Sequence, residues 1–178
     1  ADSAGRPHPV LGDVHLRRAL AAGTDRATLA HSLIGPDTRV PNGPMSQLLW
    51  ISDTARTASF DTAAAAAMLD SAGWLRPAGR PIRMRAGRPL HFDILVPATS
   101  TMRRQVAVAL QEAWRRLGAD VTVTAVDFPV FQQRLGQGRF DAYDGTYLDE
   151  PSARGLADKW TRAGWGGAHF GRYGSAGL

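Results

Sequence analysis

The sequence contains no cysteine, and it lacks any long uninterrupted hydrophobic run. Without cysteine, neither a disulfide scaffold nor a cysteine-ligated zinc site can form. No stretch approaches the run of about 18 to 20 apolar residues that a membrane-spanning helix requires. An intrinsically disordered chain is also excluded, because 44% of the 178 residues are hydrophobic. This length is enough to close one hydrophobic core, so we expect a single folded domain.

Lysine is almost absent as well. Lys159 is the one lysine among 21 basic residues, and the others are all arginine. The formal net charge of +5 could indicate a protein that binds nucleic acid. The arginines, however, include pairs spread along predicted helices, at 17–18, 103–104 and 115–116. Such pairs are typical of solvated helix faces, so we expect no nucleic-acid partner.

The sequence also lacks the common motifs of catalysis and metal binding. It contains no G-x-S-x-G nucleophile elbow, P-loop, H-E-x-x-H or G-x-G-x-x-G motif, and its five histidines are well separated. If Gly145 is set at the sixth position of a calcium-binding EF-hand loop, Phe140 stands first and Pro151 twelfth, and neither side chain can ligate. We therefore expect a protein that is not an enzyme and that holds no metal and no cofactor.

What the sequence does contain is a regular alternation of helix and strand patterns. Helices are predicted at about 14–22, 26–34, 62–72, 101–117, 130–135 and 151–160, and strands at 81–85, 88–96, 121–126 and 139–143. The first two strands form a hairpin that turns at Ala86 and Gly87. Residues 90–126 form a β-α-β unit, whose strands should be parallel with a right-handed crossover. This order predicts an α/β fold.

Two burial patterns accompany these elements. Along strand 88–96, the apolar residues Leu90, Phe92, Ile94 and Val96 alternate with His91, Asp93 and Leu95, which predicts one buried face. Along helix 101–117, the predicted apolar stripe consists of Met102, Val106, Ala109, Leu110, Ala113 and Leu117.

The segment 140–151 is the most informative for function. Strand 139–143 ends there, and in open α/β sheets ligands bind beyond the carboxyl ends of the strands. A second candidate lies in the long irregular connection 36–60, since loop aromatics such as Trp50 often line ligand clefts. The candidate ligand-binding residues are Asp144, Gly145, Thr146, Tyr147, Asp149, Glu150 and Trp50. Tyr143 is a further aromatic of this kind, and a plain strand-to-helix connection is the competing interpretation of the segment.

Several short motifs occur in an order that resembles one known family. They are DVHLRRAL at 13–20 with TDR at 24–26, PNGP at 41–44, MLDSAGW at 68–74, GRPL at 87–90, the helix at 105–118, and GRFD at 138–141. Together they resemble the family 5 extracytoplasmic solute-binding proteins, which are peptide-, dipeptide- and nickel-binding receptors of ABC importers. The resemblance covers about residues 8–175. It implies a lobe of the type II periplasmic-binding-protein fold, with a mixed β-sheet flanked by helices.

The resemblance implies that only lobe II of a two-lobe receptor is present. Residues 1–8 would be a lead-in from the missing lobe, 9–165 a single α/β lobe, and 166–178 a return segment toward the missing lobe. The ligand, a short peptide or other polar small molecule, would be clamped by hinge closure against the second lobe. In peptide-binding members an Asp four residues before the proline commonly pairs with the peptide's α-ammonium. That position here is Tyr147, so Asp149 or Glu150 would have to substitute.

The resemblance further implies an extracytoplasmic location and a cognate ABC permease as partner of the full-length protein. Contact with a membrane is expected only through a lipid anchor outside these 178 residues. The alternative is the effector-binding domain of a cytoplasmic transcriptional regulator with the same fold. A helix-turn-helix domain upstream in the gene would support that alternative, and a signal peptide or lipobox would contradict it.

Overall fold

A computed structural model describes residues 6–38, 40–41, 59–145, 158–159, 161, 164 and 169–171. The helices are α1 (Val14–Ala22), α2 (Arg26–Leu33), α3 (Thr62–Ser71), α4 (Thr101–Leu117) and α5 (Phe128–Gln137). The strands are β1 (Met84–Arg85), β2 (Arg88–Pro89), β3 (His91–Pro97), β4 (Asp120–Val126) and β5 (Ala142–Tyr143). Within these ranges, no helix is both long and apolar enough to cross a membrane. The helix expected at 151–160 falls mostly outside the described residues.

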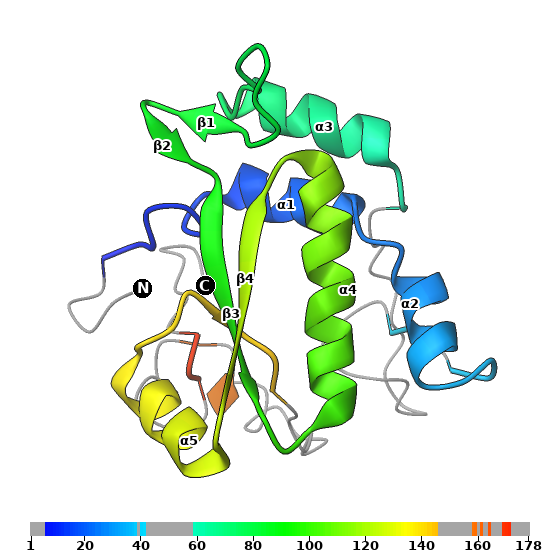
Figure 1. Cartoon of the computed structure of the whole chain (residues 1–178), viewed down its shortest axis with the longest axis vertical. Coiled ribbons are helices and arrows are strands. Elements are labelled where there is room, and N and C mark those ends of the chain that lie inside the picture. The colour runs from blue at the N-terminus through cyan, green and yellow to red at the C-terminus, as the bar shows by residue number, and fades with distance from the viewer. Residues whose placement is uncertain are drawn as a thin grey trace.

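The main sheet has the strand order β4-β3-β5 and is parallel throughout the described strands. Helix α4 connects β3 to β4, which confirms the predicted β-α-β unit. Figure 1 shows α1 and α3 at the end of the sheet where β3 and β4 begin, and α5 at the end where β4 finishes. The carboxyl ends of the strands therefore lie on the side of α5 and of the first turn of α4.

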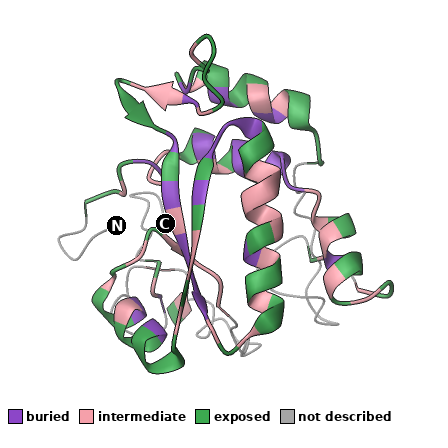
Figure 2. Ribbon diagram, viewed as in Figure 1, coloured by how far each residue is buried: buried purple, intermediate pink, exposed green. Residues whose placement is uncertain are grey.

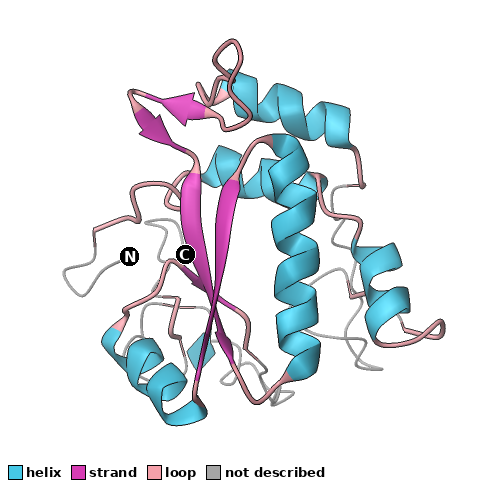
Figure 3. Cartoon of the chain, viewed as in Figure 1, coloured by secondary structure: helices cyan, strands magenta, loops and turns pink. Residues whose placement is uncertain are grey.

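The predicted hairpin forms, but its second strand is divided. Strands β1 and β2 pair antiparallel around Ala86 and Gly87, whose φ angles of 49° and 76° suit a type I′ turn (Figure 3). Leu90 then separates β2 from β3. Its N–H donates to the carbonyl of Arg83 and its carbonyl accepts from the N–H of Asp120, so the backbone changes from one sheet to the other at this residue.

Strand β3 is buried on both faces in its second half, contrary to the single buried face that its alternation predicts. Phe92 and Ile94 face the larger core, as expected. Leu95, which the alternation places on the open face, is 1% exposed because it packs against Phe131 and Leu135 of α5. Figure 2 shows the resulting concentration of buried residues along β3. The strand is central, and a central strand of a parallel sheet is covered on both sides.

The apolar stripe of α4 is also displaced from the predicted one. Met102 is exposed, whereas Ala107 is fully buried. The side chains that contact the core are Ala107, Leu110, Trp114 and Leu117. The stripe is rotated because Trp114 anchors the helix, donating from Nε1 to Thr24 Oγ1 (2.9 Å) and to the Leu20 carbonyl (3.1 Å). Leu110 and Leu117 were correctly expected on this face.

The helix ends follow local sequence closely. Asp13, Asp25, Asp61 and Ser100 each cap the helix that follows, by accepting backbone N–H groups with their side chains. Helix α3 ends in a Schellman motif. The N–H of Trp74 donates to the carbonyl of Leu69, and Gly73 has a φ of 78°.

Candidate functional site

The carboxyl edge of the main sheet brings three loops together. The N–H of Ala98, just after β3, donates to the carbonyl of Val126 at the end of β4 (2.7 Å). The N–H of Asp144, just after β5, donates to the carbonyl of Leu95 in β3 (3.1 Å). Ser100 begins α4 at the same edge. Asp144 therefore lies where the topology of a parallel sheet places ligands, as its position in the sequence predicts.

Asp144 is held in an environment that disfavours its charge. Burial raises the pKa of its carboxyl group above the usual value, and the positive charge of Arg103 partly opposes that effect. Its Oδ2 atom is buried and has no hydrogen-bond partner among the residues that the structure describes. An unpaired buried acceptor costs about 1–3 kcal/mol, so this oxygen would gain from a donor supplied by a ligand.

Only two of the predicted site residues can be placed. Asp144 and Gly145 are both half-buried at the end of β5. A Cβ atom at Gly145 would approach Tyr143 Cε2 to 2.9 Å, so a glycine here lets the backbone pass close to that ring. The remaining candidates, Thr146, Tyr147, Asp149, Glu150 and Trp50, lie outside the described residues.

The sequence groups Tyr143 with aromatics that line ligand clefts, but its ring packs within a hydrophobic cluster. Its ring meets Phe140 edge-on at 5.0 Å between centroids and Phe170 at 6.4 Å. Both partners belong with Tyr143 to the small cluster around Leu95 and Phe131, beneath α5. The aromatic side chain therefore supports the strand that carries Asp144.

Two features of the site region were missed by sequence reasoning. The Arg103–Arg104 pair predicts a solvated position, yet Arg103 is half-buried and its charge acts on Asp144. The second is a polar network joining His8 to Asp141, beside a cleft of about 400 Å³ lined by residues 6–9, 138–141 and Gly171. No local pattern could reveal it, because the two residues are 133 positions apart.

A resident metal has no obvious place in the described part of the chain. No group of three or more His, Asp or Glu side chains there could hold a metal ion. The arrangement at the carboxyl edge is one acidic oxygen in partial burial, with a cation near it. Such a site suits recognition of a polar group by hydrogen bonding.

Comparison with known proteins gives a consistent result. Residues 3–164 match the model of the bacterial extracellular solute-binding proteins, family 5 Middle. The chain is 32% identical over 85 residues to the nickel-binding periplasmic protein of Escherichia coli, covering 48% of this chain and 16% of that protein. It is 30% identical over 126 residues to protein XP55 of Streptomyces lividans, covering 71% of this chain and 23% of that protein.

A solved structure extends this likeness to the fold. The oligopeptide-binding protein AppA of Bacillus subtilis, in complex with a nonapeptide, superposes with a TM-score of 0.82 at 22% identity. The match covers 96% of this chain and 35% of AppA. The expected fold class, an α/β lobe of the type II periplasmic binding proteins, is thereby confirmed. The chain spans about a third or less of each of these relatives.

Proposed function

Because the chain belongs to the bacterial extracellular solute-binding proteins of family 5, we propose that it is a substrate-binding lobe of an ABC importer's solute receptor. The lobe clamps a peptide-like or other polar solute against a second lobe by hinge closure. The observation that carries this proposal is the buried, unpaired Oδ2 of Asp144 at the carboxyl edge of the sheet. Family members need no catalytic groups for such a role.

The chemistry of Asp144 defines what the ligand presents at this point. A hydrogen-bond donor on the solute would satisfy Oδ2, and a positively charged donor would also stabilise the ionised carboxylate. Relatives are named for ligands as different as nickel and oligopeptides. The group that meets Asp144 is therefore proposed as a donor on a polar solute, with Thr146, Tyr147, Asp149, Glu150 and Trp50 completing the contacts.

The cleft shared by residues 6–9 and Gly171 supports hinge closure. In our proposal residues 1–8 enter from the second lobe, 9–165 form this lobe, and 166–178 return. Residues 6–9 and Gly171, from the two ends of the chain, line the same cleft. Two crossings at one place on the lobe are what a hinge between two lobes requires.

The family also supports the partner and the compartment. We infer that the full-length protein works outside the cytoplasm, either in the periplasm or lipid-anchored at the outer face of the cell membrane, and that it delivers its solute to a cognate ABC permease. No observation favours the regulator domain or binding to nucleic acid.

The test is a binding measurement on the full-length receptor. Asp144→Asn keeps the shape but removes the charge, and Asp127→Asn is the matched control, since Asp127 is an exposed carboxylate that follows β4 at the same edge. Calorimetry against a panel of short peptides and other polar solutes should show affinity falling about tenfold or more for Asp144→Asn and staying unchanged for Asp127→Asn. Equal affinity in both variants would contradict the role of Asp144.

A second arm examines the residues around it. Tyr147→Ala and Asp149→Ala should weaken binding in the full receptor while the melting temperature stays nearly constant. Loss of folding would show instead that these side chains are structural. The isolated 178-residue chain should bind weakly, because the second lobe supplies the other half of the contacts.

A further inference from the structure

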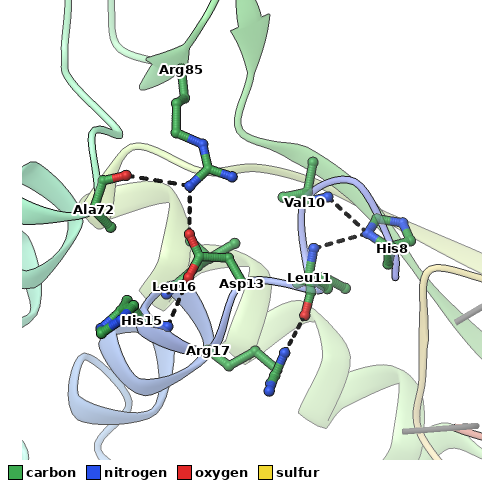
Figure 4. Close-up of polar contacts among 9 residues, drawn as sticks. All are labelled: His8, Val10, Leu11, Asp13, His15, Leu16, Arg17, Ala72 and Arg85. Atoms are coloured by element: carbon green, nitrogen blue, oxygen red, sulfur yellow. Dashed lines mark hydrogen bonds and ion pairs between the residues drawn. The ribbon is translucent and has the colours of Figure 1, made fainter. Parts of the chain in front are cut away.

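The entry of the chain into the lobe is held by the ring of His8. Its Nδ1 atom accepts the N–H groups of Val10 (3.1 Å) and Leu11 (2.8 Å), as Figure 4 shows. The His8 carbonyl accepts the N–H of Gly12 (2.9 Å), which closes the turn that leads into α1. A ring nitrogen that accepts two N–H groups carries no proton, so the proton of the neutral ring is on Nε2.

The other side of the ring faces a carboxylate. His8 Nε2 lies 2.9 Å from Asp141 Oδ1, and Asp141 Oδ2 accepts the backbone N–H of Asp93 in β3 (2.9 Å). The hydrogen bond from His8 lowers the pKa of Asp141 below its usual value, with burial opposing and the Asp93 N–H assisting. Asp141 is therefore a carboxylate that joins the lead-in to β3, immediately before β5.

We propose that His8 and Asp141 form a proton-sensitive latch, which fixes the direction in which the lead-in leaves the lobe. The neutral Nε2–H ring satisfies both partners at once. A second proton can bind only at Nδ1, where it would face the N–H groups of Val10 and Leu11, so these two hydrogen bonds must break. The contact with Asp141 persists and gains charge. Protonation therefore opens the turn at residues 8–12 while the ring remains attached to the sheet.

Charged and titratable groups from several elements lie near the latch. The charged and titratable groups near the network are Arg6 on the lead-in, Asp13 at the N-cap of α1, Arg17 on α1, Arg139 and Asp141 before β5, Asp93 and His91 on β3, and Asp120 on β4. Arg17 donates to the carbonyl of Leu11 (2.7 Å) and so holds the far side of the same turn.

Nuclear magnetic resonance on the 178-residue chain tests the latch directly. At about pH 8, the ring nitrogens of His8 should report the Nε2–H tautomer. Between about pH 8 and about pH 5, the amides of Val10 and Leu11 should lose hydrogen-exchange protection by about tenfold, after correction for intrinsic exchange. Amides inside α1, such as that of Ala19, should keep theirs. An Nδ1–H tautomer at pH 8, or protection that does not change with pH, would overturn the proposal.

Two variants separate the ring's proton from its shape. Asparagine places an acceptor near the Nδ1 position and cannot titrate, so His8→Asn should protect Val10 and Leu11 equally at both pH values. Glutamine reaches toward Asp141 but leaves the turn without its acceptor, so His8→Gln should reduce protection at both. The matched control is His31→Asn, which removes an exposed histidine of α2 that contacts the carbonyl of Thr38, and it should retain the pH response of the native chain. A pH response that survives in His8→Asn would assign it to another group.

Discussion

The Nη1 atom of Arg85 lies 2.5 Å from the Oδ2 atom of Asp13, so one ion pair joins the hairpin to the start of α1 (Figure 4). The other oxygen of Asp13 caps α1 by accepting the N–H of His15 (2.9 Å). The guanidinium of Arg85 also lies 4.7 Å from the ring centroid of the buried Trp74. A single arginine thereby fixes the hairpin against the ends of two helices.

The ion pair makes the effect of Asp13 on stability depend on pH. Burial favours the protonated form, but the Arg85 hydrogen bond and the cap contacts outweigh it, so the pKa of Asp13 is lowered from 3.8. Because the folded-state pKa lies below the unfolded one, this stabilisation is complete above the unfolded value and is lost as the pH falls through the folded one. Asp13→Asn, which keeps the cap, should lower the free energy of unfolding by about 1 kcal/mol at pH 7.

Urea denaturation at a series of pH values measures this difference. The gap between the native chain and Asp13→Asn should close as the pH falls below about 4. Asp13→Ala, which also removes the cap, should cost about a further 1 kcal/mol at every pH. A gap that stays constant into acid would mean that the charge of Asp13 has no part in stability.

Replacing Gly23 by a larger residue should destabilise the fold because there is no room for a side chain. Its φ of −82° is open to any residue, so the backbone conformation does not require a glycine there. A Cβ atom there would lie 2.4 Å from Leu117 Cδ1 and 3.3 Å from the Cβ of Ala65. Gly23→Ala should therefore destabilise the fold by about 1–3 kcal/mol. Gly136→Ala is the control, because its Cβ would meet nothing within 4 Å and should stabilise α5 by up to about 1 kcal/mol. Thermal unfolding of both variants decides the point.

Arg83 should be essential to folding despite carrying a charge. It is 5% exposed, and its guanidinium donates to the carbonyls of Leu117 (2.7 Å) and Trp74 (2.6 Å) and to the carboxylate of Asp70. Arg83→Met leaves these acceptors unpaired and should cost on the order of 3 kcal/mol. Arg88→Met, at an exposed position of the same hairpin, should change stability by less than about 0.5 kcal/mol. Similar denaturation midpoints for the two variants would refute this role.

The ionised carboxylate of Asp144 should lower the stability of the fold, although we propose that it contributes to ligand binding. Burial raises its folded-state pKa above 3.8, so the unfolding free energy falls as the pH rises from 3.8 through the folded-state value. At neutral pH, Asp144→Asn should be more stable than the native chain by about 1 kcal/mol, a small value because the side chain is only half-buried. Below about pH 3 the two should melt together. A variant that is less stable at pH 7 would show that the carboxylate has a partner in the folded protein.

The secondary structure was largely predictable because its causes are local. The caps at Asp13, Asp61 and Ser100 and the Schellman motif at Gly73 each depend on contacts within about one or two helical turns. The β-branched run before Asp127 likewise predicts a strand, and Gly87 predicts the turn of the hairpin. Periodicity was less reliable for burial, since it indicates an apolar stripe without saying what covers the opposite side.

The candidate site was predictable only in outline. A strand ending before Asp144 sufficed to place that carboxylate at the ligand edge, because parallel strands end together. The packing role of Tyr143 could not be predicted from the sequence, since the contact with Phe170 depends on how distant segments meet. Arg103 looked like a solvated residue for the same reason.

The sequence by itself determined the alternation of helices and strands, the caps of several helices, and the family to which the chain belongs. Tertiary structure alone decided that Leu95 is buried, that Arg83 holds two helix ends, and that His8 meets Asp141. The physical reason is the separation along the sequence between the residues that interact. A cap or a turn is stable through neighbours a few residues away, whereas these contacts join segments that approach only after the whole lobe has packed.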